Sequence, residues 1–406
     1  MTYNDTGNMA TTAVHGLHNT NAEHAHLTPV FATSAFTFDS AEQGMQRFSG
    51  KEKGYTYSRF GNPTTQAAAD IVASLETFGI SDEKDNPLAA KALLTASGQA
   101  AMSALFLSLL SSGDTVLCSR SVYGGTYEFL ADFVQKLGIR CILADMSDVS
   151  ALQHLLSKDK TIKILHLETP ANPTMQCIDI QAVCNIAKQH GKLVSIDNTF
   201  ATPYLQQPFR YGVDFIFHST TKFLNGHGSA IGGVLIGKDV ELMNTAVYKT
   251  YKLLGGNANP FDAFMLIQGI KTLALRMEQH SSNAEKAADF LSKHQAVSVV
   301  NYNGLPTHPD YEISKKQMKR PGAVLSFELK DGFDKAKQFI DKLQLCTRAV
   351  SLGTADTLIS HPASMSHAGM SKEARLKAGV TDGLIRISVG LEAINDILDD
   401  LEQALA

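Results

Sequence analysis

The sequence predicts an α/β fold in which a mostly parallel sheet is covered by helices on both faces. Three observations lead to this prediction. Short apolar runs recur from about residue 93, most of them are apolar on both faces, and amphipathic helical segments separate them. A strand with two apolar faces is buried on both sides, and helices that alternate with such strands cover a parallel sheet.

The first 62 residues are expected to form an arm outside this sheet. They are polar and rich in Thr, Asn and Ser, and the stretches "SGKEKG" and "FGNPT" are turn signals. Helices are predicted in segments such as "GQAAMSALFLSLL", "GTYEFLADFVQKLG" and "QAVCNIAKQHG". The strands of the sheet are expected, in chain order, at 92–96, 114–119, 140–145, 162–168, 192–197, 214–219 and 232–237.

The pattern changes near residue 260, where we place a domain boundary. One long helical pattern covers 263–294 and leads into a more polar region with fewer strands. That region includes the apolar run "GAVLSFEL" and ends in the helix "AINDILDDLEQALA". The sequence therefore predicts an arm over 1–62, a sheet domain over 63–260 and a smaller α+β domain over 261–406.

The composition indicates an enzyme-sized protein with a large core. Charged residues make up 19% of the 406 residues, below the average of about 25%. The net charge of −4 and the lack of a long Lys/Arg run argue against nucleic acid and anionic membranes as partners. The longest apolar run, "AAMSALFLSLL", is too short to span a bilayer. Because the amino terminus lacks the basic and apolar regions of a signal peptide, we expect a cytoplasmic protein.

Neither the cysteines nor the histidines predict a metal site. The five cysteines have no CxxC spacing and are expected to be reduced and mostly buried. His15, His18, His24 and His26 cluster near the start, but no Cys or carboxylate pattern completes a set of ligands. We expect a solvated arm there and no bound metal.

Polar residues that can carry chemistry follow the ends of four predicted strands. In doubly wound sheets, ligands bind outside the carboxyl ends of the strands. A glycine at a helix start, as in "SGQ", also offers backbone amides to an anion. The residues at these strand ends are Ser97, Gly98 and Gln99, then Asn172, then Asp197, and finally Ser219, Thr221 and Lys222.

Together these residues predict a site for pyridoxal 5′-phosphate. That cofactor needs a lysine that condenses with its aldehyde, an acid beside its pyridine nitrogen and a cradle for its phosphate. A partly desolvated lysine at a strand end is a candidate for a lowered pKa. The alternative for Lys222 is a solvated loop lysine, but Asp197 stands 25 positions earlier (222 − 197) at a neighbouring strand end.

The run "SIDNTFATPYLQQPFRYGVDFIFHSTTKFLNGHG" resembles the Cys/Met-metabolism family of pyridoxal-phosphate enzymes. The resemblance extends from about residue 28 to the end, through "YTYSRFGNPTT", "TASGQAAMSALF", "SVYGGTYEF", "ETPANPT", "HPASMSHAG" and "GLIRISVGLE". It implies fold type I, the aspartate-aminotransferase type, with 63–260 as the cofactor-binding domain.

The resemblance implies a role for each strand-end residue. Lys222 matches the Schiff-base lysine, and Asp197 matches the acid that keeps the pyridine nitrogen protonated. Tyr57 and Arg59 match residues that reach the phosphate of a neighbouring subunit, which implies an obligate oligomer, a homotetramer built as a dimer of dimers. The phosphate itself is implied to be held by Ser97, Gly98, Gln99, Ser219 and Thr221.

The family also implies residues for the substrate. Tyr123 matches the tyrosine that stacks over the cofactor and acts as acid and base; from the residues alone, its less favoured alternative is a core aromatic beside a Gly-Gly turn. Arg386 matches the arginine that grips the substrate carboxylate in a bidentate fork, and its alternative is a structural salt bridge. Asn172 and Ser351 match residues that orient the cofactor and that arginine.

Which reaction the chain performs is predicted less directly. The last third resembles methionine γ-lyase, whereas Gly125 stands where many of those lyases have a cysteine, and "GHGSAIGG" is similar to the sulfhydrylases. Ser366 replaces a usual threonine. Our first prediction is a γ-lyase that converts methionine, homocysteine or cystathionine into 2-oxobutanoate, ammonia and a thiol. The second is γ-replacement by an O-acetyl- or O-succinylhomoserine sulfhydrylase or a cystathionine γ-synthase. The third is a non-catalytic pyridoxal-phosphate-binding protein, which intact site residues argue against.

Overall fold

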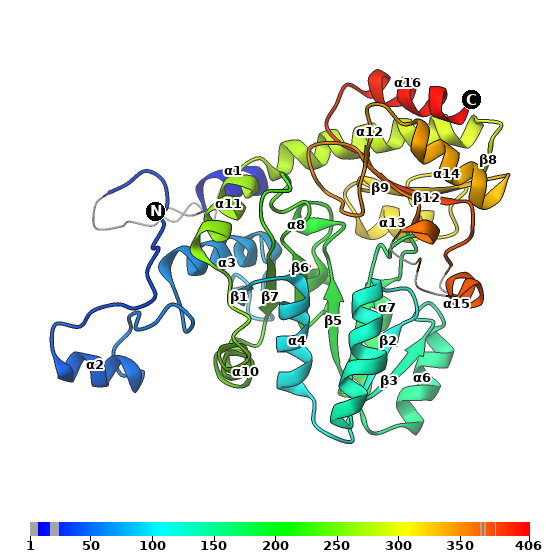
Figure 1. The fold of residues 1–406 in the computed structure, drawn as a ribbon. Helices are drawn as coiled ribbons and strands as arrows, with labels where there is room; N and C mark the ends of the chain where they lie inside the picture. The colour runs from blue at the N-terminus through cyan, green and yellow to red at the C-terminus, as the bar shows by residue number, and fades with distance from the viewer. Residues whose placement is uncertain (1–6, 17–23, 366–367, 369–370, 378) are drawn as a thin grey trace.

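The computed structural model describes residues 7–16, 24–365, 368, 371–377 and 379–406. Two residues named from the sequence, His18 and Ser366, lie outside these ranges. Within them the chain forms two sheets, and helices pack on each (Figure 1). No helix in the described residues has both the length and the apolar character needed to cross a membrane.

The larger sheet has seven strands, and each lies within one residue of its predicted bounds. The spatial order is β1-β7-β6-β5-β4-β2-β3, and only β7 runs antiparallel to its neighbours. The mostly parallel α/β fold expected from the sequence is therefore confirmed. The strands are β1 (Lys91–Thr95), β2 (Thr115–Ser119), β3 (Arg140–Ala144), β4 (Ile162–Glu168), β5 (Leu193–Asp197), β6 (Phe215–Ser219) and β7 (Gly233–Gly237).

Each face of this sheet has its own hydrophobic core, because the strands are apolar on both sides. One core joins the sheet to α3 (Pro63–Glu76), α6 (Val149–Lys158), α7 (Ile180–Gln189) and α11 (Pro260–Ile270). The other core joins it to α4 (Gly98–Leu109) and α10 (Tyr248–Leu254). Shorter helices connect these elements: α5 (Gly124–Glu128), α8 (Thr202–Leu205) and α9 (Val240–Leu242), with π-helices at Phe129–Phe133 and Met243–Val247 and 3₁₀ turns at Val134–Leu137 and Pro208–Tyr211.

The second sheet has five strands in the order β10-β11-β12-β9-β8, with only β10 and β11 parallel. Its strands are β8 (Val297–Asn301), β9 (Val324–Leu329), β10 (Thr347–Arg348), β11 (Leu358–Ser360) and β12 (Leu384–Ser388). A third hydrophobic core packs it against α12 (Leu273–Lys293), α14 (Gly332–Lys342) and α16 (Ile394–Leu405). The remaining helices here are α13 (Tyr311–Gln317), the 3₁₀ turn Pro362–Ser364 and α15 (Lys372–Lys377). Figure 1 shows α16 lying along α12.

The long helical pattern predicted over 263–294 is interrupted. The chain forms α11 and α12, with Lys271 and Thr272 between them. The carbonyl of Gly269 accepts a hydrogen bond from Arg276 Nη2 at 2.6 Å and another from Thr272 Oγ1 at 3.2 Å. These side chains satisfy a carbonyl that a continuous helix would pair with its own backbone, so the helix can end there.

In the segment before α3, Ala13 belongs to a core of the larger sheet, whereas the part around residues 38–48 lies apart from both sheets. The segment contains α1 (Met9–His15) and α2 (Ala41–Phe48), and Figure 1 shows α2 at the end of an extended stretch that leads away from the sheet. Phe38, Met45 and Phe48 are exposed on it. The domain divisions at residues 62 and 260 stay predictions.

Candidate active site

The predicted site residues that follow strands of the larger sheet come together at one edge of that sheet. Because β1 and β6 are both antiparallel to β7, they run in the same direction as β4 and β5, and their carboxyl ends meet. The contact at Gly98 shows how close two of these ends are. A methyl group built on Gly98 would lie 3.0 Å from Ser219 Cβ, so the start of α4 touches the end of β6.

The start of α4 has the features of a phosphate cradle. Ser97 caps the helix, because its Oγ accepts from Ala100 N at 3.1 Å. Gly98 adds no side chain, and the first amides of the helix, including that of Gln99, lie at the positive end of its dipole. Thr221 supplies a hydroxyl whose oxygen accepts from Gly232 N at 3.0 Å. This combination of amides, a glycine and hydroxyls fits a phosphate dianion.

Lys222 lies just beyond the end of β6 and is partly buried. Its Nζ donates to Ser351 Oγ at 3.0 Å. Burial, reinforced by the positive charge of Arg386, lowers the pKa of Lys222 to about 8. A lysine must lose its proton before it can attack a carbonyl carbon, so this shift suits the chemistry predicted for it.

Asp197 ends β5, and its Oδ1 accepts from Thr199 N at 2.9 Å. Burial raises the pKa of Asp197, while the hydrogen bonds from Thr199 and the nearby His218 act in the opposite direction. Behind it lies a fully buried pair in which His218 Nε2 is 2.6 Å from Glu76 Oε1. A protonated pyridine beside Asp197 would favour the charged form of this carboxyl group, as the nearby His218 does.

Arg386 stands in the middle of β12 and is buried. Its Nη2 donates to the carbonyls of Val350 at 2.9 Å and Ser351 at 3.0 Å, and its Nη1 donates to Asn172 Oδ1 at 3.3 Å. Burial lowers the pKa of Arg386 to about 10. Within the described part of the chain Arg386 makes no ion pair with a carboxylate, and its Nε has no hydrogen-bond partner. Both observations fit a guanidinium that binds an anionic ligand rather than a structural salt bridge.

Tyr123 is 53% exposed, so it is not a core aromatic in this chain. It precedes α5, and its backbone N donates to Glu168 Oε2 at 2.6 Å. Its phenol lies near enough to Arg386 to act electrostatically on the guanidinium, because its presence raises the pKa of Arg386 against the effect of burial. The phenol and the guanidinium therefore lie within electrostatic reach of each other.

Tyr57 and Arg59 are not joined to this cluster within one chain. Arg59 donates to the carbonyl of Lys252 at 2.6 Å, and its guanidinium lies 4.7 Å from the ring centre of Phe60. Tyr57 is exposed. Among the described residues, neither side chain forms a hydrogen bond or ion pair with the phosphate cradle or with Lys222.

Three buried groups of the site were not predicted from the sequence: Glu168, Glu76 and His218. Glu168 is the last residue of β4 and is the register partner of Asp197 on β5. Its place at the end of the run "IKILHLE" was a signal, because a charged residue that ends a buried strand stands at the ligand edge. Glu76 and His218 lie 142 residues apart and gave no such signal.

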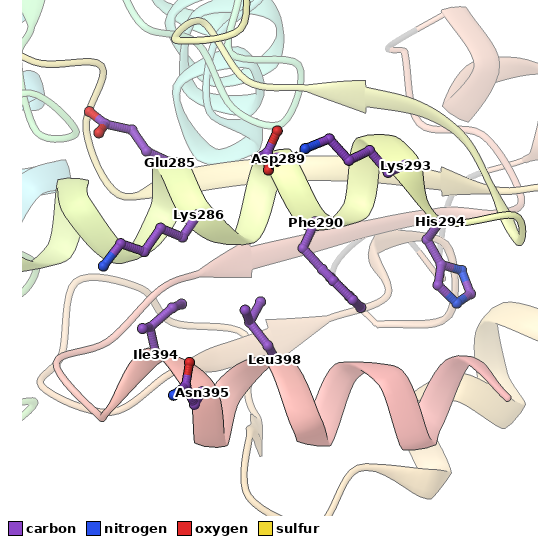
Figure 2. Close-up of a pocket in the computed structure, with 9 residues that line it drawn as sticks. All are labelled: Glu285, Lys286, Asp289, Phe290, Lys293, His294, Ile394, Asn395 and Leu398. Carbon is purple, nitrogen blue, oxygen red and sulfur yellow. Dashed lines mark hydrogen bonds and ion pairs between the residues drawn. The ribbon is translucent and has the colours of Figure 1, made fainter.

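A groove elsewhere in the molecule lies between α12 and α16 (Figure 2). Its volume is about 800 Å³, and Phe290 and Leu398 point into it among side chains of both charges. None of its lining residues follows a strand of the larger sheet, so it takes no part in the site. No group of three or more metal-ligating side chains occurs in the described ranges, and all five cysteines, each within those ranges, are free.

The fold and the residues at its strand ends define a pyridoxal-phosphate enzyme of fold type I. The model of the Cys/Met metabolism PLP-dependent enzymes matches residues 10–406, and the chain belongs to that family. Its cofactor is pyridoxal 5′-phosphate. The family and the fold expected from the sequence are therefore confirmed.

Similar proteins carry several activities. The chain is 42% identical over 399 residues to an L-methionine gamma-lyase of Fusobacterium nucleatum subsp. polymorphum, covering 98% of both chains. It is also 42% identical to a cystathionine beta-lyase of Lactococcus lactis subsp. cremoris, covering 93% of both. Among solved structures, cystathionine gamma synthase from Xanthomonas oryzae pv. oryzae in complex with cystathionine matches with a TM-score of 0.89 and 36% identity, covering 98% of this chain and 97% of that one.

Proposed function

We propose that the chain is a sulfur-amino-acid γ-lyase that converts methionine, homocysteine or cystathionine into 2-oxobutanoate, ammonia and a thiol. The observation that carries the proposal is that Ser351 contacts both Lys222 and Arg386, and that Arg386 is a buried guanidinium without an ion pair in the described residues. An amino-acid carboxylate held by Arg386 would bring its α-carbon near the lysine. The 42% identity to an L-methionine gamma-lyase over nearly the whole chain supports the choice of substrate.

The cofactor would be held by residues from several strand ends. Lys222 would anchor it covalently, Asp197 would face its pyridine nitrogen, and Tyr123 would cover its ring. When bound, pyridoxal phosphate supplies an electron sink for the negative charge that develops at the substrate α-carbon. Its phosphate would lie against Ser97, Gly98, Gln99, Ser219 and Thr221, with Tyr57 and Arg59 of a neighbouring copy completing the cradle.

The protons would be moved by two side chains. Once the substrate amine has displaced it, Lys222, whose pKa of about 8 makes it a usable base near neutral pH, would take the α-proton; after passing that proton to the bound cofactor it would be neutral again and could take a β-proton. Tyr123 would donate a proton to the departing thiolate. Arg386 would hold the carboxylate through its Nε, which has no hydrogen-bond partner, while Asn172 and Ser351 keep the guanidinium in place by accepting from Nη1 and Nη2.

We also propose that the chain works as a homotetramer, a dimer of dimers, in the cytoplasm. The arm supports an oligomer, because Phe38, Met45 and Phe48 are exposed on a segment that leads away from its own sheets. Exposed aromatic and sulfur-containing side chains gathered on one segment are typical of a surface that a partner covers.

A second candidate function is γ-replacement, in which a thiol adds at the γ-carbon. Gly125 favours it, since a side chain there would meet Gln99 Nε2 and the ring of Tyr123. A glycine lets Gln99 and the ring of Tyr123 keep these positions, so neither has to move into space that an incoming thiol or a larger γ-substituent would need. The structural similarity to a cystathionine gamma synthase supports the same alternative. A non-catalytic role would require a damaged site, and none of the matched residues is replaced.

One assay separates these functions. The purified holoenzyme is given methionine, homocysteine, cystathionine, O-acetylhomoserine and O-succinylhomoserine, each with and without sulfide, and 2-oxobutanoate and homocysteine are measured. We expect 2-oxobutanoate from methionine, homocysteine and cystathionine without sulfide, with some homocysteine from the esters when sulfide is present. If these three sulfur amino acids give no keto acid and the esters give homocysteine efficiently, the γ-lyase proposal is wrong.

A further inference from the structure

Glu168 is a buried carboxyl group that the proposed reaction does not use. It is the last residue of β4, and its register partner across the sheet is Asp197, the last residue of β5. Register partners on adjacent parallel strands point to the same face, so the two carboxyl groups lie side by side. Glu168 is only 4% exposed.

The two carboxyl groups differ in their surroundings. Burial, together with the charge of Asp197, raises the pKa of Glu168 to about 8. Asp197 accepts from Thr199, and His218 lies close by; both hold the pKa of Asp197 down against burial. Two adjacent buried carboxyl groups cannot both be charged at low cost, and the proton therefore lies on Glu168 near neutral pH.

The carboxyl group of Glu168 is hydrogen-bonded to the backbone of two segments that carry site residues. Its Oε2 accepts from Tyr123 N at 2.6 Å, and its Oε1 accepts from Asn172 N at 3.2 Å. Tyr123 leads into α5, while Asn172 Oδ1 accepts from Arg386 Nη1 at 3.3 Å. One side chain thus holds both the turn that carries the ring-stacking tyrosine and the loop that touches the carboxylate-binding arginine.

We propose that Glu168 is a positioning residue: its two backbone hydrogen bonds fix the distance between Tyr123 and the Asn172–Arg386 contact. The inference rests on the proposed function for the roles of Tyr123, Asn172 and Arg386. Glu168 itself touches neither substrate nor reacting atoms. It acts on cofactor orientation through Tyr123 and on the grip of the amino-acid carboxylate through Asn172.

The test compares Glu168→Gln with Asp400→Asn in the holoenzyme. Gln keeps one acceptor oxygen but turns an NH₂ toward the second amide, so one backbone bond is lost. Asp400 is a matched control outside the site, because this buried carboxylate also accepts from backbone amides, those of Gln344, Leu345 and Cys346. Asp400→Asn reports what the loss of such a carboxylate does to stability alone.

Three quantities are measured: the visible circular dichroism of the bound cofactor, the Kd for norvaline from the change in visible absorbance, and kcat. Norvaline has an amino-acid carboxylate but no γ-leaving group, so it binds without elimination. We expect Glu168→Gln to alter the circular dichroism, to weaken norvaline binding by about tenfold and to lower kcat by about tenfold or more. Asp400→Asn should lower Tm and leave all three unchanged.

The proposal is overturned if Glu168→Gln leaves all three quantities within about twofold of wild type, or if Asp400→Asn changes them equally. If Glu168→Gln does not fold, Glu168→Asp is measured instead; it keeps a carboxyl group, but its shorter reach should loosen both amide bonds and move the same quantities. The circular dichroism and norvaline binding do not depend on γ-elimination. A wild-type enzyme that forms no 2-oxobutanoate would therefore refute the proposed function without deciding the role of Glu168.

Discussion

Lys222 Nζ donates to Ser351 Oγ at 3.0 Å, and this bond joins the end of β6 in the larger sheet to the loop between β10 and β11 in the smaller one. The carbonyl of the same Ser351 accepts from Arg386 Nη2 at 3.0 Å. One serine thus contacts both the lysine and the arginine, 129 and 35 residues away. Contacts between the two sheets therefore set the distance between Lys222, which is proposed to bind the cofactor covalently, and Arg386, which is proposed to bind the substrate carboxylate.

Lys222→Ala should abolish the visible absorbance of the covalently anchored cofactor and all turnover. No other lysine follows a strand end at this edge, so no other amine can replace it. The measurements are the visible spectrum of the dialysed protein and 2-oxobutanoate formation. A yellow, fully active Lys222→Ala enzyme would rule out the assignment.

The uptake of pyridoxal phosphate by the cofactor-free protein should accelerate as pH rises through about 8. Burial lowers the pKa of Lys222 to about 8. A depressed lysine pKa means that the reactive neutral amine gains population as pH increases, from about one molecule in ten at pH 7. The rate is followed by visible absorbance from pH 6 to 9.

Two variants of Arg386 separate the two causes of the lowered Lys222 pKa, which are burial and the positive charge of Arg386. Arg386→Leu removes the positive charge and should move the midpoint of uptake above that of wild type, whereas Arg386→Lys retains the charge and should keep it. Burial is the larger cause and remains in both variants. An uptake rate independent of pH in wild type would contradict the lowered pKa.

Asp197→Asn should keep bound cofactor and lose most activity. An amide cannot stabilise a protonated pyridine, so the electron sink is weakened, and we expect kcat to fall by about a hundredfold or more. Cofactor content is measured after denaturation, and kcat with methionine. Turnover equal to wild type would show that Asp197 has a structural role only.

Arg59→Ala should weaken cofactor binding, and the defect should be rescued in mixed oligomers. Within one chain Arg59 contacts Lys252 and Phe60 rather than the phosphate cradle. Mixing Arg59→Ala subunits with Lys222→Ala subunits, which have an intact arm, should restore activity if the arm acts on a neighbour. Activity that stays absent in the mixture, with oligomers verified by mass, would place the role of Arg59 within its own chain.

Gly125→Cys should narrow the substrate range. A Cβ at this position would meet Gln99 and the ring of Tyr123, so at least one of these two side chains must shift from its place in the site. We expect kcat/KM for cystathionine to fall by about tenfold relative to that for methionine. Gly124→Cys is the matched control, because a Cβ there meets no atom within 4 Å. Equal losses on both substrates, or equal effects of the two variants, would contradict the prediction.

The strands and the residues at their ends could be predicted from the sequence because both depend on local information. An apolar run such as "IKILHLE" is a buried strand in any α/β sheet, and the residue after it stands at the ligand edge by topology alone. Lys222, Asp197, Asn172 and the Ser97–Gln99 turn were found in this way. The helix break at Lys271 and Thr272 was missed, because the guanidinium that ends α11 belongs to Arg276 on the next helix.

Only the tertiary structure decided which of these groups meet. Asn172 and Arg386 are 214 residues apart, Glu76 and His218 are 142 apart, and Tyr123 and Glu168 are 45 apart. No periodicity links such positions, since side chains on different elements meet only where packing of whole helices and sheets brings them together. The sequence by itself determined which residues reach the edge of the sheet. The packing of the two sheets and the pairing of β4 with β5 decided that Glu168 lies beside Asp197 and that Lys222 lies near Arg386.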